Sequence, residues 1–180
     1  AHKIELEESS DSLVLILKRL FVGIWVVFAN LLLFSLTRIF FRKYNEKMKP
    51  TEVIVYTVGT LGDNVLMLPA IAAIKNSFPA AKITAIVNCD GFSDNPARSI
   101  LKPSSLIDNL VTLPAHPVQR QGFNLHINSP YNLEKGCDLF VNLSPFGNRG
   151  WIGAVLREMI YAKKLGAKTA IGFKMSTYSR

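Results

Sequence analysis

The residues most able to do chemistry form one short loop, whose members are Gly59, Thr60, Leu61, Gly62, Asp63 and Asn64. Its two glycines permit a tight turn and let a ligand approach the backbone closely. Asp63 falls at or near the first turn of a predicted helix, where backbone N–H groups and the helix dipole favour the ionised carboxylate. An ionised carboxylate beside a ligand can act as a general base. The same residue can also be a helix N-cap, and the two roles do not exclude each other.

Two common phosphate-binding loops do not fit this spacing. The chain has no GxxxxGK[ST] motif, so the loop is not a P-loop. The chain also lacks GxGxxG, because the loop reads GxxG followed by an acid, and that acid would repel a pyrophosphate bound at the helix end. A nucleotide-dependent oxidoreductase is therefore disfavoured.

From residue 50 onwards the sequence alternates between predicted strands and helices. We expect strands at residues 52–58 and 82–88, within 106–113, and at 137–143 and 168–173, helices at residues 63–78, 95–102 and 149–167, and a loop at residues 114–136. This order predicts an α/β fold, a Rossmann-like parallel sheet with helices on both faces. Ligands of such sheets bind beyond the carboxyl ends of the strands, where residues 59–64 and 143–149 both fall.

An apolar segment precedes this domain. Residues 20–37, LFVGIWVVFANLLLFSLT, carry no charge, and basic residues flank them on both sides. As a helix the segment would be about 27 Å long, close to the thickness of a bilayer core. We therefore predict a membrane-anchoring helix at residues 13–43, which either spans the bilayer or lies in the plane of the membrane. Asn30 in its middle keeps a buried helix as a further alternative.

The net charge of +8 is distributed unevenly along the chain. Residues 1–12 form an acidic tail, whereas the basic excess follows the apolar segment and continues through a linker at residues 44–51. Basic residues in that place indicate contact with membrane lipid and not with nucleic acid. By the positive-inside rule they also place the globular part, residues 52–180, in the cytoplasm.

The two cysteines, Cys89 and Cys137, lie far apart and form no CxxC motif. This pattern is typical of free thiols in a reducing compartment. It predicts no metal site, and nothing else in the sequence calls for a cofactor.

The segment VIVYTVGTLGDNVLMLPAIAAIKNSFPAAKITAIVN resembles the opening of glycosyltransferase family 9, the heptosyltransferases of lipopolysaccharide core synthesis. Members begin with a strand, a G-x-x-G-D loop, a helix with LPA, then FP and a second strand. The matching residues are Gly59, Gly62, Asp63, Leu68, Pro69, Ala70, Phe78 and Pro79. The later segment from Cys137 to Phe173 is similar to the family's YDLVIDLQG strand, helix and IGF sequence.

This resemblance implies the N-terminal half of a GT-B enzyme, which binds the acceptor while a second domain holds the donor. It implies that Asp63 takes a proton from an acceptor hydroxyl, with inversion and without metal. The loop at residues 59–64 would line the acceptor site. Asn148 and Arg149 would bind sugar or phosphate groups of the acceptor from the opposite loop, together with Asn142 and Ser144. An exposed position at a helix start is the plain alternative for Arg149. The donor would be a nucleotide-sugar, ADP-linked, and the location the bacterial inner membrane.

The sequence departs from the family pattern in three respects. Asn142 stands where the family often has Asp, and Pro145 and Phe146 replace the usual Gln-Gly. The membrane segment is not part of the usual pattern. The second domain would follow Arg180, so we expect the 180-residue chain alone to be inactive. A non-catalytic, membrane-tethered Rossmann-like binding module is therefore the alternative to a transferase that acts on a glycolipid or oligosaccharide.

Overall fold

The centre of the molecule is a parallel sheet of five strands in the order β3-β2-β1-β6-β7. The computed structural model describes residues 2–57, 61–88, 96–113, 118–121, 124–127, 136–144 and 152–174. The sheet strands are β1 (Glu52–Thr57), β2 (Lys82–Asn88), β3 (Asn109–Leu113), β6 (Cys137–Asn142) and β7 (Ala167–Ile171). The first four lie within segments that the sequence predicts as strands or as containing one, and β7 begins one residue before the predicted strand at 168–173.

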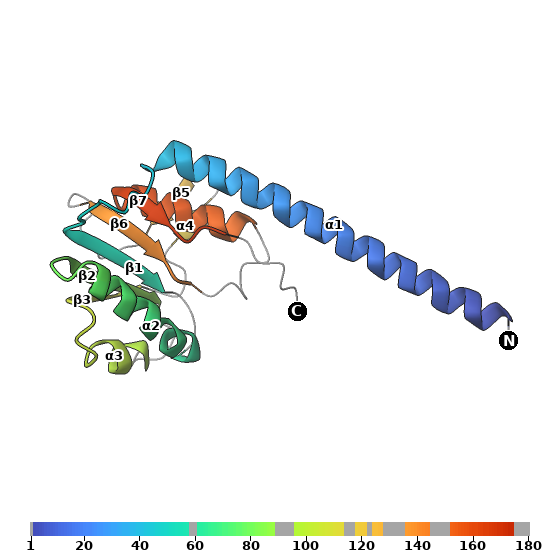
Figure 1. The fold of residues 1–180 in the computed structure, drawn as a ribbon, viewed down its shortest axis with the longest axis horizontal. Helices are drawn as coiled ribbons and strands as arrows, with labels where there is room; N and C mark the ends of the chain where they lie inside the picture. Colours follow the sequence, from blue (N-terminus) through green and yellow to red (C-terminus); the bar gives the residue numbers. More distant parts are fainter. Residues whose placement is uncertain are drawn as a thin grey trace.

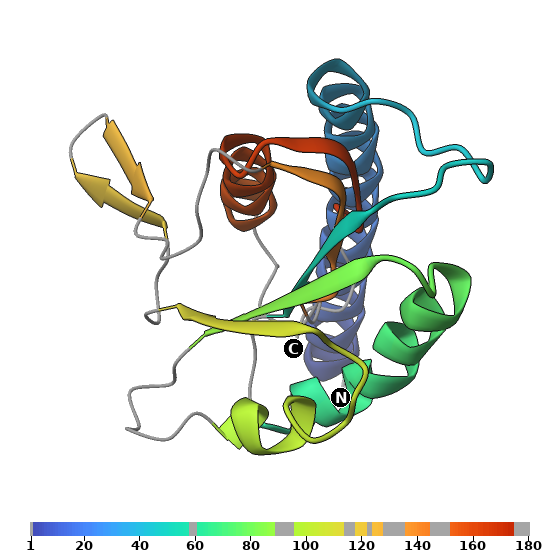
Figure 2. The ribbon, with the colours of Figure 1, turned by 90° about the vertical axis from the view of Figure 1, so that its left-hand side faces the viewer.

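Helices cover both faces of this sheet, as the alternation of elements predicts. Figures 1 and 2 show α2 (Leu61–Ser77) and α3 (Pro96–Leu101) on one side, and α4 (Ile152–Lys164) with the C-terminal half of α1 (His2–Phe40) on the other. The predicted α/β fold class is therefore confirmed.

The strands next to the middle of the sheet are buried on both sides. In β1, Val53 and Val55 pack towards α2 and α3, whereas Ile54 and Tyr56 pack towards α4 and α1. This explains why EVIVYT shows no alternation of polar and apolar residues. The two layers of core differ in composition, since the layer under α4 is rich in aromatic rings and the other is almost entirely aliphatic.

Helix ends differ from the sequence prediction by a few residues. Helix α2 begins at Leu61, two positions before the predicted start, so Asp63 lies within its first turn. Helix α4 ends at Lys164 with two lysines in its last turn, where they complement the helix dipole. Gly166 follows in the left-handed region at φ 73°, the conformation that ends many helices.

The region predicted as a loop at residues 114–136 contains two short strands, so that prediction is wrong in part. Strands β4 (Val118–Gln121) and β5 (Asn124–Ile127) pair antiparallel as a separate two-stranded sheet. Prolines, glutamines and asparagines around them indicated a loop. The two strands pair through their backbones in spite of that composition. In the sequence a Gly-Phe dipeptide separates them, and a glycine followed by another residue is typical of two-residue hairpin turns.

Helix α1 is continuous from His2 to Phe40, so the stretch predicted as a tail is helical from its second residue. Its N-terminal half projects beyond the sheet, as Figure 1 shows. Its C-terminal half packs against α4 through Val26, Ala29 and Leu33, which are buried at spacings of three and four residues. Residues Val14–Phe40 are long and apolar enough to cross a membrane, which by itself is weak evidence for a membrane span.

The end of α1 is fixed to the domain by aromatic and polar contacts. The ring of Phe41 stacks on Phe173 with centroids 6.1 Å apart, and Phe173 stacks on Phe140 at 6.2 Å. The backbone N–H of Arg42 donates to the carbonyl of Lys168 at 2.8 Å. Lys163 Nζ donates to the carbonyl of Phe40 at 2.9 Å. These contacts hold α1 against both α4 and β7.

Candidate functional site

The strand order reverses between β1 and β6, and this places the carboxyl ends of these two strands side by side. From β1 the chain adds β2 and β3 on one side, and it later adds β6 and β7 on the other. Such a switch point opens a crevice at the carboxyl ends of the two strands, where open α/β sheets bind their ligands. Tyr56 of β1 pairs with Asn142 of β6 near these ends. Residues 59–64 follow β1, and residues 143–149 follow β6.

The loop after β1 leads into the first turn of α2. Leu61 and Gly62 are exposed there, and Asp63 is half-buried. Gly59 and Thr60, both predicted to line the acceptor site, lie outside the described residues. The described part of the loop therefore presents one carboxylate at the start of a helix, next to the switch point of the sheet.

Asn64 ties this turn to the end of β1. Its side chain is buried, and its Oδ1 accepts a hydrogen bond from Thr57 Oγ1 at 2.9 Å. The sequence predicts Asn64 as a substrate-binding residue; the structure places its side chain inside the fold. This bond joins the last residue of the strand to the first turn of the helix, so it positions Asp63. Thr57 was not predicted as a site residue.

The residues after β6 form a second small network. Asn142 is buried, and its Nδ2 donates to Glu158 Oε2 of α4 at 2.8 Å. Its Oδ1 accepts from the backbone N–H of Ser144 at 3.2 Å, and Ser144 is buried as well. The amide is thus hydrogen-bonded on both sides, as buried polar groups require. Asn148 and Arg149, also predicted as site residues, lie outside the described residues.

Glu158 gives a physical reason for the departure at position 142. An aspartate there would place a second carboxylate at hydrogen-bond distance from Glu158, which disfavours ionisation of both. The amide of Asn142 instead donates to the glutamate. Sequence reasoning missed Glu158, because its partner lies 16 residues away and on another element.

Gly172 closes the network from the side of β7. It adopts φ +92°, and a Cβ built on it would lie 2.2 Å from the backbone oxygen of Asn142. Only glycine permits so close an approach of two backbones. Gly172 thus fixes the position of Asn142, and its place in the family-like IGF segment was the available signal.

A strongly perturbed carboxylate, that of Asp138, lies at the opposite, amino-terminal edge of the sheet. Burial alone would raise the pKa of Asp138, but hydrogen bonds from Lys168, Thr51 and Glu52 outweigh it and hold that pKa well below its usual range. Asp108 is similar, because the backbone N–H of Ile83 lowers its pKa against desolvation. Both carboxylates join strands and loops, so we assign them to the fold and not to the chemistry.

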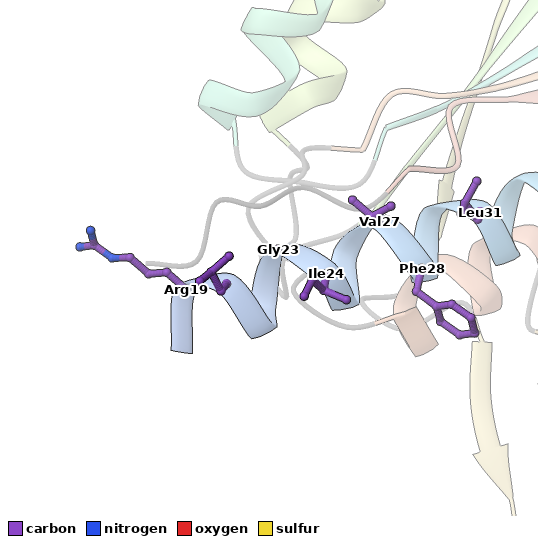
Figure 3. Close-up of a pocket in the computed structure, with 7 residues that line it drawn as sticks. Arg19, Gly23, Ile24, Val27, Phe28 and Leu31 are labelled. Carbon is purple, nitrogen blue, oxygen red and sulfur yellow. The ribbon is translucent and has the colours of Figure 1, made fainter. Parts of the chain in front are cut away.

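Two further features bear on what the site can hold. Within the described part of the chain, no group of three or more His, Cys, Asp or Glu residues could bind a metal ion. A hollow of about 680 Å³ lies along the projecting half of α1 between Arg19 and Leu31 (Figure 3). Every lining residue that the structure describes belongs to α1, so the hollow follows an apolar face of that helix.

Comparisons with known proteins give one distant likeness. No protein-family model matches the sequence, and no curated protein matches it. Among solved structures, the chain is similar to the crystal structure of the glycosyl transferase family 9 from Veillonella parvula DSM 2008, with 15% sequence identity and a TM-score of 0.46. The match covers 75% of this chain and 34% of that one, so the chain spans about a third of that protein's length. A likeness of this degree establishes neither family membership nor activity.

Proposed function

We propose that this chain is the acceptor-binding domain of an inverting glycosyltransferase and that Asp63 is its general base. One observation carries the proposal. Asp63 lies in the first turn of α2, at the carboxyl end of β1 and beside the crevice between β1 and β6. The Thr57–Asn64 hydrogen bond fixes that turn to the strand. A carboxylate held in this place suits the deprotonation of an acceptor hydroxyl.

The proposed reaction is a direct displacement. The acceptor oxygen forms a bond to the anomeric carbon of the donor as its proton moves to Asp63. The bond from that carbon to the nucleotide diphosphate breaks, and the electron pair leaves with the diphosphate. Attack from the opposite side inverts the configuration. Within this chain, Asp63 supplies the base, and residues 142–144 form the facing side of the crevice.

We further propose the substrates and the setting of this reaction. The donor is an ADP-linked heptose or related sugar, held by a nucleotide-sugar domain of the whole protein. The acceptor is a lipid-linked or lipopolysaccharide-core saccharide. Helix α1 attaches the domain to the bacterial inner membrane, and the exposed apolar side chains along residues 14–40 support this. The basic residues after the helix favour a cytoplasmic domain.

The test is transfer of a labelled sugar from the ADP-linked donor to lipid extract, measured in membranes that contain the natural gene product. Asp63→Asn keeps the shape of the side chain but cannot accept the proton, so we expect transfer to fall by about 10²- to 10⁴-fold. Glu46→Gln, an exposed acid of the linker, is the matched control and should leave transfer unchanged. Full transfer by the Asp63→Asn protein would refute the assignment.

A specific observation favours the second candidate, a non-catalytic membrane-tethered binding module. The side chains of Asn64 and Asn142, two of the predicted site residues, are hydrogen-bonded within the fold. A binding module would keep these bonds and need no base. Such a protein would retain acceptor binding in the Asp63→Asn variant and show no transfer in either form.

A further inference from the structure

A groove of about 560 Å³ runs between α1 and the edge strand β7. Aromatic rings line its apolar part, among them Phe34, Phe41 and Phe173. Four exposed cationic residues also line it: Arg38, Arg42, Lys43 and Lys174. The groove thus combines an apolar wall with a cationic rim, which suits a ligand with an apolar chain and a negative head.

All charged residues that line the groove, among those that the structure describes, are cationic. None of these residues is an aspartate or a glutamate. Arg38 lies over the ring of Phe34 with its guanidinium carbon 4.6 Å from the ring centroid, and this stacking holds the side chain beside the apolar wall. A planar guanidinium donates two parallel hydrogen bonds to a phosphate, which is the anion best matched to such a rim.

The groove opens beside the side of α1 that the domain leaves uncovered. On that side Leu31, Phe34 and Ile39 are 62%, 57% and 74% exposed. Asn30 and Thr37 line the groove instead, and Thr37 Oγ1 donates to the carbonyl of Leu33 at 2.7 Å. Asn30 and Thr37 thus lie beside the domain at the groove, whereas Leu31, Phe34 and Ile39 are exposed on the outer side of α1, where lipid chains would lie.

We propose that the α1–β7 groove binds the phosphate headgroup of an anionic phospholipid, whose acyl chain follows the outer side of α1. The occupant is a lipid because the cationic rim adjoins an exposed apolar helix face. The proposal rests on the membrane attachment proposed above and is independent of glycosyl transfer.

A lipid in this groove would lie next to the candidate active site. Gly172 lines the groove, and its backbone touches Asn142 at the end of β6. The same short segment thus separates the lipid headgroup from the crevice between β1 and β6. Binding would hold the crevice at the membrane surface, where a lipid-linked acceptor is found.

The test measures contact between one tryptophan and one lipid species. Tyr44 lines the groove and is 39% exposed, so Tyr44→Trp, combined with Trp25→Phe and Trp151→Phe, places a single reporter there. Vesicles contain equal amounts of phosphatidylglycerol and phosphatidylcholine, and only the identity of the brominated, quenching lipid changes. The matched control is Trp151→Phe alone, which keeps Trp25 on the exposed surface of α1.

We expect brominated phosphatidylglycerol to quench the reporter at position 44 several times more strongly than brominated phosphatidylcholine. Two arginines beside an anionic headgroup favour it by roughly 30-fold over a zwitterionic one. Trp25 should be quenched equally by both lipids, because its surroundings are acyl chains only. Adding Arg38→Gln and Arg42→Gln should abolish the preference at position 44. Lys82→Gln combined with Lys102→Gln removes the same amount of charge from residues outside the groove. This pair should leave the preference for phosphatidylglycerol at position 44 unchanged.

Four results would overturn the proposal. Equal quenching at position 44 by the two lipids would show that the groove holds no anionic lipid. Loss of the preference in the lysine control pair would show diffuse attraction of a basic protein. Displacement by inorganic phosphate at constant ionic strength would indicate a site for free phosphate. Absence of quenching at Trp25 as well would refute membrane attachment itself, and sugar transfer would still be testable in solution.

Discussion

Replacement of Gly172 by alanine should destabilise the protein strongly, because two independent penalties coincide at this position. The residue adopts φ +92°, where a side chain is strained. The added Cβ would lie 2.2 Å from the oxygen of Asn142 and 3.1 Å from its carbonyl carbon. Real Cβ atoms essentially never lie within 3.0 Å of such a neighbour, so the ends of β6 and β7 would have to separate by about 1 Å.

The size of the effect follows from these penalties. A non-glycine residue at positive φ costs about 1–2 kcal/mol. Separation of the two strand ends would also weaken the bond from Asn142 to Glu158, a hydrogen bond to a charged group and therefore worth about 1.5–3 kcal/mol. A loss of about 3–4 kcal/mol in the free energy of unfolding is expected, which lowers Tm by about 10 °C in a domain of this size.

Thermal unfolding followed by circular dichroism measures this, with two other glycines as controls. Gly136 has φ +62° but its nearest neighbour, the oxygen of Gly166, would be 3.2 Å away, so Gly136→Ala should cost about half as much. Gly23 lies inside α1, and an added Cβ would have no atom within 4 Å. Gly23→Ala should therefore not lower Tm, and it should stabilise the helix by about 1 kcal/mol. If Gly172→Ala unfolds at the same temperature as Gly23→Ala, the reasoning is wrong.

Three further predictions concern stability and reactivity. Burial would raise the pKa of Asp138, but the hydrogen bonds that its carboxylate accepts from Lys168 and its other partners lower that pKa. The ionised carboxylate therefore stabilises the fold above about pH 4, and this stabilisation is lost as the pH falls further. Asp138→Asn should cost about 2 kcal/mol at pH 7 in denaturant titrations, and wild type and variant should converge in acid. Leu33→Ala should cost about 2–5 kcal/mol, whereas Leu31→Ala on the exposed side should change the free energy of unfolding by less than about 0.5 kcal/mol. Burial raises the pKa of the Cys137 thiol to about 12, so maleimide at pH 8 should label it only when the protein unfolds.

Each of these three has a result that would contradict it. Equal stability of Asp138→Asn and wild type at pH 7 would mean that the carboxylate adds nothing to the fold. Equal effects of the two leucine substitutions would mean that α1 is not docked on α4. Rapid labelling of Cys137 in the folded protein would mean that β6 is open to solvent.

The strands could be predicted from the sequence because each follows a local rule. Residues 82–88 form a short run rich in β-branched residues that ends before turn residues, and the observed strand has the same bounds. The first residue of α2 was harder to predict, because the sequence at Leu61 and Gly62 fits the preceding turn as well as it fits a helix. The pair β4 and β5 was missed because composition, which the prediction relied on, says little about backbone pairing between four-residue strands.

The candidate site was predicted only in part, for a different reason. Asp63 could be named because the loops that follow parallel strands are known places for ligands, whereas Asn142 was named from the family resemblance. Thr57 and Glu158 were missed because their importance depends on partners in other elements, which no local pattern encodes. Gly172 stands in the IGF segment, but its close approach to Asn142 appears only in the fold. The docking of α1 was hidden as well. A leucine that packs against protein and one that packs against lipid look the same in a sequence.

The docking of α1 on α4 has a consequence for the thickness of the membrane. The part of the candidate span that stays clear of the domain, residues 14–25, includes Lys18 and Arg19 and is about 18 Å long, whereas a bilayer core is about 30 Å thick. A docked helix that crosses the core would therefore meet a hydrophobic mismatch of about 12 Å, which local thinning of the bilayer must absorb. A helix that lies along the surface meets none. The contacts of Val26, Ala29 and Leu33 would thus link the stability of the globular domain to the lipid composition around the helix.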